Sequence, residues 1–104
     1  MDRQHGTIIV QFNALDLGKA LSQALNIPLI STRVVRFADT ESDVVLEQSF
    51  HTIAGQEVIL VAQFGGSFAA WSINDFLLML CFLARRIHAA GAVSLRCVLP
   101  YFPY

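Results

Sequence analysis

The feature that most constrains the fold of this chain is its last third, where a helix pattern leads directly into a strand pattern. The helix pattern covers residues 73–90, follows a capping-box pair of Ser72 and Asp75, and stops at Gly91. Residues 94–100 then form a short apolar run typical of a buried strand. A helix that returns into such a strand is half of a parallel crossover, and ligands bind beyond the carboxyl ends of parallel strands. We therefore expect the active site to begin where this chain ends.

Four strand patterns and a second helix pattern precede this unit. The strand patterns occupy residues 7–12, 29–37, 43–47 and 58–62, and a helix capped by Asn13 runs to about Leu25. The first and fourth strands are almost continuously apolar, as in the centre of a parallel sheet, whereas the mixed second strand is compatible with a sheet edge. The order β-α-β-β-β-α-β predicts an α/β fold in three layers, with an open, mostly parallel sheet and helices on its faces. At 104 residues the chain is expected to form one domain.

The balance of apolar and charged residues excludes several classes of protein. A net charge of −1 provides no basic surface for nucleic acid, and a hydrophobic share of 55% suggests that a partner covers some apolar surface. The longest apolar run, residues 76–84, is about half as long as a membrane span, and the first residues carry no secretory signal pattern. We expect a cytoplasmic location without a membrane anchor. Cys81 and Cys97 lack metal-ligand spacing and are predicted to be reduced thiols in the core.

Three polar features favour ordinary structural roles over chemistry. Residues 65–67, Gly-Gly-Ser, lie between a strand and a helix but lack the lysine of a phosphate-binding P-loop, which favours a simple connector. Arg85 and Arg86 could meet a phosphate, but on the polar side of a helix they are more often solvated. The three histidines show no metal-ligand spacing and are expected on the surface: His5, His51 and His88.

The segment 36–43 offers a stronger candidate for a binding site. It places acidic residues beside an arginine and an aromatic residue in a break between two strands. A solvated turn is one interpretation. The other is an aromatic ring that stacks on a nucleobase, flanked by carboxylates that accept hydrogen bonds from the exocyclic amine. Spacing alone does not choose between the two.

A resemblance favours the second interpretation. The pattern RF-x-D-x-E formed by Arg36, Phe37, Asp39 and Glu41 resembles the RFSDGE or RFPDGE segment of the ribose-phosphate pyrophosphokinases. Three further pieces fall in the same order as in that family, and with the first they cover most of residues 7–104. Residues 26–29 resemble its LGIPL, residues 73–80 its VNDNLMELL, and residues 98–104 its VIPYFPY. The resemblance implies the N-terminal domain of such an enzyme, with a phosphoribosyltransferase-like fold.

The same resemblance implies a division of roles. In that family the RF-x-D-x-E segment holds the adenine of ATP, often in the site of a neighbouring subunit. It therefore implies that Phe37 is the stacking ring and that Asp39 and Glu41 are its polar partners. It also implies Mg²⁺, ATP and ribose 5-phosphate as the family's cofactor and substrates, and assembly into dimers and larger rings.

Several catalytic pieces of that family have no counterpart in these 104 residues. They are an Arg-Gln-Asp motif, a metal-binding histidine, a basic loop, an acidic loop for ribose 5-phosphate and the whole C-terminal domain. We therefore assign no catalytic and no metal-binding residue, and we expect the isolated chain to be inactive.

Two other functions stay open. One is a non-catalytic interaction or regulatory subunit that packs on itself or on a full-length synthetase. The other is a small nucleotide-binding module. The expected partners are thus another copy of the chain, the missing domain or a full-length synthetase, with ATP as a possible ligand.

Overall fold

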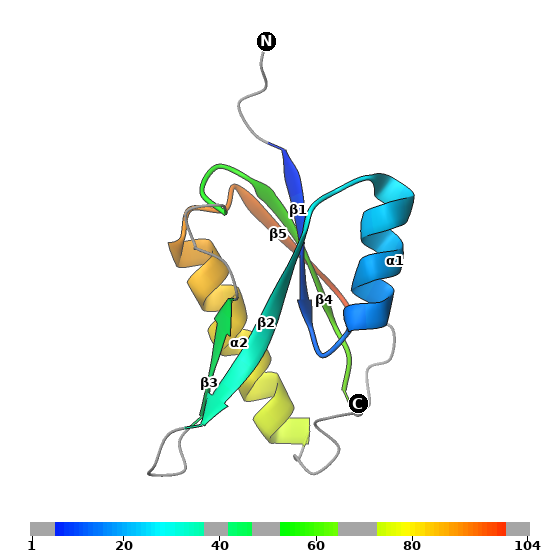
Figure 1. Cartoon of the computed structure of the whole chain (residues 1–104). Coiled ribbons are helices and arrows are strands. Elements are labelled where there is room, and N and C mark those ends of the chain that lie inside the picture. Colours follow the sequence, from blue (N-terminus) through cyan, green and yellow to red (C-terminus); the bar gives the residue numbers. More distant parts are fainter. Residues whose placement is uncertain (1–5, 37–41, 47–52, 65–72, 100–104) are drawn as a thin grey trace.

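A computed structural model of the chain describes residues 6–36, 42–46, 53–64 and 73–99 (Figure 1). The predicted order of elements is confirmed in these residues. The elements are β1 (Thr7–Phe12), α1 (Leu15–Leu25), β2 (Leu29–Arg36), β3 (Ser42–Leu46), β4 (Glu57–Ala62), α2 (Ile73–Ala89) and β5 (Ser94–Val98). The bounds of β1 are as predicted, and those of the other elements differ from the predicted ones by at most two residues.

The strands form one five-stranded sheet in the order β3-β2-β1-β4-β5. Neighbouring strands are parallel, except that β3 runs antiparallel to β2. The central pair is in register over its whole length, from Thr7 opposite Glu57 to Phe12 opposite Ala62. Helix α1 lies against one face and α2 against the other (Figure 1). The three-layer α/β fold predicted from the sequence is confirmed.

Alternating residues of the central strands divide the core into two parts, as the period of a strand requires. Ile8, Val10 and Phe12 point toward α2, into a cluster that includes Phe76, Leu80, Leu83 and Ile87 of that helix. Ile9 and Val61 point the other way, toward Leu17 and Leu21 of α1. Because both faces of β1 are covered, four of its six residues are hydrophobic with at most 7% exposure: Ile8, Ile9, Val10 and Phe12.

The start of α1 differs from the prediction. Asn13 does not cap the helix, because its backbone is in the left-handed region with φ 57°. Ala14 occupies the cap position, and its backbone N–H donates a hydrogen bond of 2.8 Å to the side-chain Oε1 of Gln11. A buried glutamine at the end of β1 therefore satisfies one of the free N–H groups at the start of the helix. The end at Asn26, also left-handed, agrees with the predicted stop.

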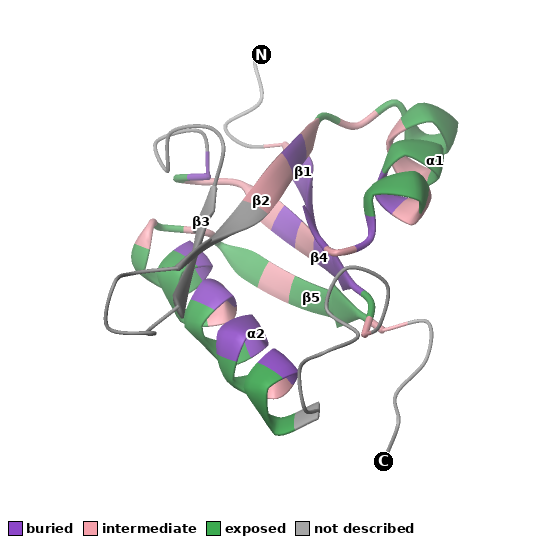
Figure 2. Cartoon of the chain, turned by 60° about the horizontal axis from the view of Figure 1, so that its bottom comes forward, coloured by how far each residue is buried: buried purple, intermediate pink, exposed green. Residues whose placement is uncertain are grey.

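The edges of the sheet also differ from the prediction. Strand β2 lies inside the sheet, and the edge strands are β3 and β5. Strand β5 was expected to be buried, but four of its five residues are exposed (Figure 2). An apolar run identifies a strand but does not say whether a second neighbour covers it, which explains the error.

Four local predictions have different outcomes. The thiols of Cys81 and Cys97 are on exposed residues, so the assignment of both to the core is wrong. The break between the third and fourth strand patterns predicts a surface turn at residues 51–55, but Ile53 within it is fully buried. Gly91 has φ 98° and follows the last turn of α2, as predicted. Ser72 lies outside the described residues, so its capping role stays a prediction.

Among the described residues, no helix combines the length and the apolar character needed to cross a membrane.

Candidate functional site

The described part of the sheet has a topological switch point between β1 and β4. From β1 the chain passes through α1 to β2 on one side, and from β4 it passes through α2 to β5 on the other. The two helices lie on opposite faces, so the connections diverge at the carboxyl ends of β1 and β4 (Figure 1). Open α/β sheets bind ligands at such a point. We therefore take this edge as the candidate site.

Two amide-bearing residues join the strand ends at the switch point. The side-chain Nδ2 of Asn13 donates a hydrogen bond of 2.8 Å to the backbone carbonyl of Gln63. The backbone N–H of Gln63 in turn donates to the carbonyl of Phe12 over 3.2 Å. Asparagine tolerates the left-handed backbone at residue 13 better than most residues do. The segments that follow β1 and β4 are thereby held together.

The link between Asn13 and Gln63 was not predicted. The sequence pattern indicates a helix cap at Asn13 and no role for Gln63. The available signal was position, because each residue directly follows an apolar strand that belongs in the sheet centre. The left-handed conformation that turns the Asn13 side chain away from the helix was not visible in the sequence.

An aromatic cluster lies beneath this edge. The rings of Phe12 and Phe76 are stacked, with centroids 5.4 Å apart and planes 11° from parallel. Phe64 meets Phe76 edge to face at 5.3 Å. The cluster joins the end of β1, the segment after β4 and the first turns of α2, and Phe12 and Phe76 are almost fully buried. It gives the switch point a rigid, apolar and uncharged base.

The three predicted adenine-binding residues, Phe37, Asp39 and Glu41, lie outside the described residues. The structure does describe the residues that flank them, because Arg36 of β2 pairs with Ser42 of β3. Strand β2 runs five residues beyond Ser31, which is opposite Gln11 of β1. At 3.3 Å per residue, Arg36 is thus about 16 Å farther along the strand direction than the end of that pairing.

The pair Arg36–Ser42 and the switch point therefore lie toward the same edge of the sheet. The strands β2 and β3 extend from the sheet as a two-stranded ribbon (Figure 1). In the sequence, residues 37–41 stand between these two strands, and they lie outside the described residues. The structure brings together Asn13 and Gln63, and it leaves the roles of Phe37, Asp39 and Glu41 as predictions.

The described residues contain no group of three or more histidine, cysteine, aspartate or glutamate side chains that could hold a metal ion. His88 is exposed on α2, whereas His5 and His51 lie outside the described residues. The 65–67 segment, which was expected to be a connector, also lies outside them.

Cys97 lies on the edge strand β5, and its thiol has a shifted pKa. Burial of the thiol raises its pKa above the ordinary value of 9.0. The residue is on the exposed edge strand, but its neighbours Leu95 and Leu99 pack against the α2 side of the core. A thiol with a raised pKa is a poor nucleophile at neutral pH, so Cys97 is a weak candidate for catalysis.

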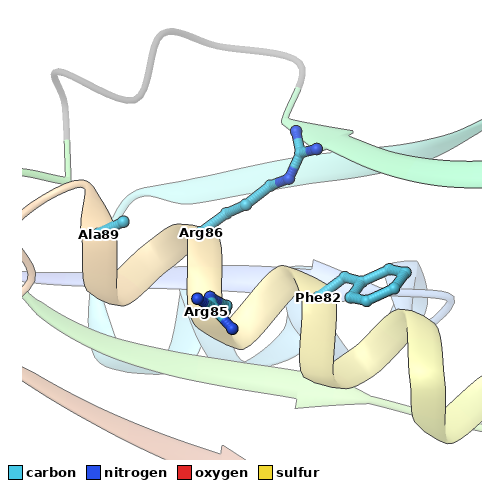
Figure 3. Close-up of a pocket in the computed structure, with 4 residues that line it drawn as sticks. All are labelled: Phe82, Arg85, Arg86 and Ala89. Atoms are coloured by element: carbon cyan, nitrogen blue, oxygen red, sulfur yellow. The ribbon is translucent and has the colours of Figure 1, made fainter.

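A hollow in the surface lies on the outer side of α2. It has a volume of about 370 Å³ and is lined by Phe82, Arg85, Arg86 and Ala89 (Figure 3). Both arginines are exposed, as predicted. The hollow is in the second half of α2, whereas the helix starts on the side of the carboxyl edge, so it is separate from the switch point.

The sequence of this chain is similar to those of known proteins. A sequence model of the N-terminal domain of ribose phosphate pyrophosphokinase matches residues 7–104. The ribose-phosphate pyrophosphokinase of Agrobacterium fabrum is 34% identical over 88 residues, which are 85% of this chain and 26% of that protein. Ribose-phosphate pyrophosphokinase 4 of Saccharomyces cerevisiae is 32% identical over 89 residues, or 86% of this chain and 26% of the yeast protein.

The fold has a counterpart among solved structures. The phosphoribosylpyrophosphate synthetase of Mycobacterium smegmatis superposes with a TM-score of 0.68 and 15% identity, over 96% of this chain and 31% of that one. The present chain thus spans about a quarter of the length of the curated relatives that it matches. Since the family match covers every residue from β1 onward, this chain belongs to the ribose-phosphate pyrophosphokinase family, as a member that corresponds to its N-terminal domain.

Proposed function

We propose that this chain acts as the N-terminal domain of a ribose-phosphate diphosphokinase and contributes the adenine-binding part of its ATP site. The complete reaction transfers the pyrophosphoryl group of Mg-ATP to ribose 5-phosphate and releases AMP. The observation that carries the proposal is the family match over residues 7–104, which includes the RF-x-D-x-E segment. The flanking pair Arg36–Ser42 supports it, because that pair lies toward the ligand-binding edge of the sheet.

In this proposal Phe37 stacks on the adenine ring, and Asp39 and Glu41 accept hydrogen bonds from its exocyclic amine or from the ribose. Stacking of a base on an aromatic ring contributes about 1 to 3 kcal/mol. Such a contact selects a nucleotide and positions it, but it does not stabilise charge on the phosphates.

The chain alone is proposed to bind without catalysing. Pyrophosphoryl transfer needs cations and a metal ion near the phosphates. The described residues at the switch point, Asn13 and Gln63, offer neutral amides instead. The cationic and metal-binding groups would then come from another domain or subunit, within a homo-oligomer or a full-length synthetase in the cytoplasm.

Binding of ATP to the purified chain tests the proposal. We expect saturable binding that Phe37→Ala abolishes and Phe37→Tyr retains, because tyrosine keeps the aromatic ring. Asp39→Asn and Glu41→Gln should each weaken binding, whereas Asp16→Asn, which removes an exposed carboxylate on α1, should not. An unchanged titration with Phe37→Ala would refute the assigned site. Formation of phosphoribosyl pyrophosphate by the chain alone would refute its inactivity.

A second candidate function is a non-catalytic subunit that regulates a full-length synthetase. The observation that favours it is the exposure of large apolar side chains, including Leu78 and Phe82 on α2 and Val98 on β5. Addition of the chain to a purified full-length synthetase should then change its activity or its assembly state. No change of either kind would rule this candidate out.

A further inference from the structure

The acidic and basic residues of this chain are unevenly distributed along its sequence. All eight acidic residues lie within residues 1–75, whereas residues 76–104 contain three arginines and no aspartate or glutamate. Two of these arginines, Arg85 and Arg86, are exposed on the second half of α2, and the exposed His88 follows them. A chain with a net charge of −1 therefore has a locally cationic surface on this helix.

Large apolar side chains lie on the same side of α2 as Arg85. Leu78 is 50% exposed and Phe82 is 39% exposed. With Arg85 and Ala89 they recur every three or four residues, so the four residues form one stripe along the helix. The stripe is separate from the core-facing side of α2, whose residues belong to the buried cluster (Figure 2).

The hollow of about 370 Å³ lies on this stripe. Figure 3 shows Phe82, Arg85 and Arg86 projecting from the helix, while Ala89 contributes only a methyl group. The walls are thus an aromatic ring and the aliphatic stems of two arginines, which suit an apolar side chain with a carboxylate beside it. Arg86 already takes part in another interaction, so we assign the contact with a carboxylate to Arg85.

The helix dipole explains only part of this arrangement. Cations near the end of a helix stabilise it, which accounts for Arg86 and His88 in the last turn of α2. It does not account for the exposed rings and alkyl groups of Phe82 and Leu78 beside them. Adjoining exposed apolar side chains are typical of an interaction site, and the cations next to them call for a partner that is apolar and acidic.

Two other kinds of acidic partner fit this surface less well. Nucleic acid is bound by a long row of cations, and a net charge of −1 provides no such row. An anionic membrane takes up apolar side chains that project together from a helix with many lysines and arginines. Here the apolar groups line a hollow, which receives a side chain from a partner.

We propose that the outer side of α2 is a docking surface for an acidic amphipathic helix of another protein. The partner helix lies along the stripe from Leu78 to Ala89, which is about 16 Å long at 1.5 Å per residue. It inserts a leucine or phenylalanine side chain into the hollow and places a glutamate or aspartate at Arg85. The two helices run antiparallel, because acidic residues stabilise the first turn of a helix and that turn then lies beside the arginines. So short a contact gives weak, transient binding. The surface is separate from the proposed adenine site and does not depend on ATP binding.

A synthetic peptide tests the docking surface. The probe is a fluorescently labelled amphipathic helix with glutamates in its first turn and leucines at intervals of three and four residues. Fluorescence anisotropy with the wild-type chain should show saturable binding. Arg85→Glu should weaken binding at least about tenfold, because it turns an attraction into a repulsion. Phe82→Ala, which removes one wall of the hollow, should weaken it about tenfold.

His88→Glu is the matched control, since it introduces the same carboxylate at an exposed position of α2 outside the hollow. It should weaken binding by no more than about twofold, because exposed charges are screened by salt. A peptide with lysines in place of the glutamates should bind Arg85→Glu better than it binds the wild-type chain. Circular dichroism confirms that each variant is folded.

Three results would overturn the proposal. They are the absence of peptide binding, equal losses for Arg85→Glu and His88→Glu, and shifts in the NMR spectrum that centre on an element other than α2. Vesicles of anionic phospholipid and duplex DNA are the remaining comparisons. If either binds as tightly as the peptide and is affected equally by Arg85→Glu, the surface is a general anion binder and the acidic helix is not its specific occupant.

Discussion

Gly18 is the position where the contact between α1 and the sheet can be tested most directly. It is the buried glycine of α1, at the point where the helix approaches β1 and β2. A Cβ added there would lie 3.1 Å from Cβ of Gln11 and 3.2 Å from Cδ1 of Leu29. Carbon atoms normally pack at about 3.5 to 4.0 Å, so both contacts are too short. Leu29 can rotate, but Cβ of Gln11 is fixed to the backbone of the central strand.

Two opposite effects determine the stability of Gly18→Ala. Replacing glycine by alanine inside a helix stabilises by about 1 kcal/mol. Overpacking of a core contact costs about 1 to 3 kcal/mol. Because Gln11 cannot move without disturbing its hydrogen bond to Ala14, we expect the second effect to prevail. The net loss should be up to about 2 kcal/mol for Gly18→Ala and about 3 kcal/mol for Gly18→Val.

Urea unfolding followed by circular dichroism measures both variants. Ala20→Gly on the exposed side of the same helix is the matched control, since it reports helix propensity without a change in packing. If Gly18→Ala stabilises the chain by as much as Ala20→Gly destabilises it, the close contact with β1 does not exist as described. The account of how α1 is positioned would then be refuted.

Two further predictions concern the strand ends and the edge strand. Asn13→Ala should destabilise by about 1 to 3 kcal/mol in urea unfolding, because it removes the hydrogen bond to Gln63 and places alanine at φ 57°. Asn13→Gly should cost less, since glycine tolerates that backbone; equal losses would contradict the backbone argument. For Cys97, burial raises the pKa of the thiol, so in a Cys81→Ser background its alkylation should be slower than that of an unfolded peptide at mildly alkaline pH. The thiol ionises at a lower pH in the unfolded chain than in the folded one, so the free energy of unfolding should fall as the pH rises above 9.0. An alkylation rate of the folded chain that reaches half its maximum below pH 9.0 would refute this prediction.

The architecture could be predicted from the sequence because two strong signals agree. The apolar runs at β1 and β4 identify the central strands, and the period of α2 identifies a helix that crosses over them. The exposure of β5 could not be predicted in the same way. Whether Cys97 and Val98 are covered depends on what lies beside the strand, and a run of apolar residues contains no information about that.

The candidate site was harder to predict because its geometry is a property of the backbone. The function of Asn13 follows from a positive φ, which reverses the direction of its side chain, and asparagine is equally common at helix caps. The role of Gln11 was not predicted either. A single polar residue in a buried strand matches no sequence pattern for a helix start, although its amide oxygen accepts the hydrogen bond from the backbone N–H of Ala14 before α1.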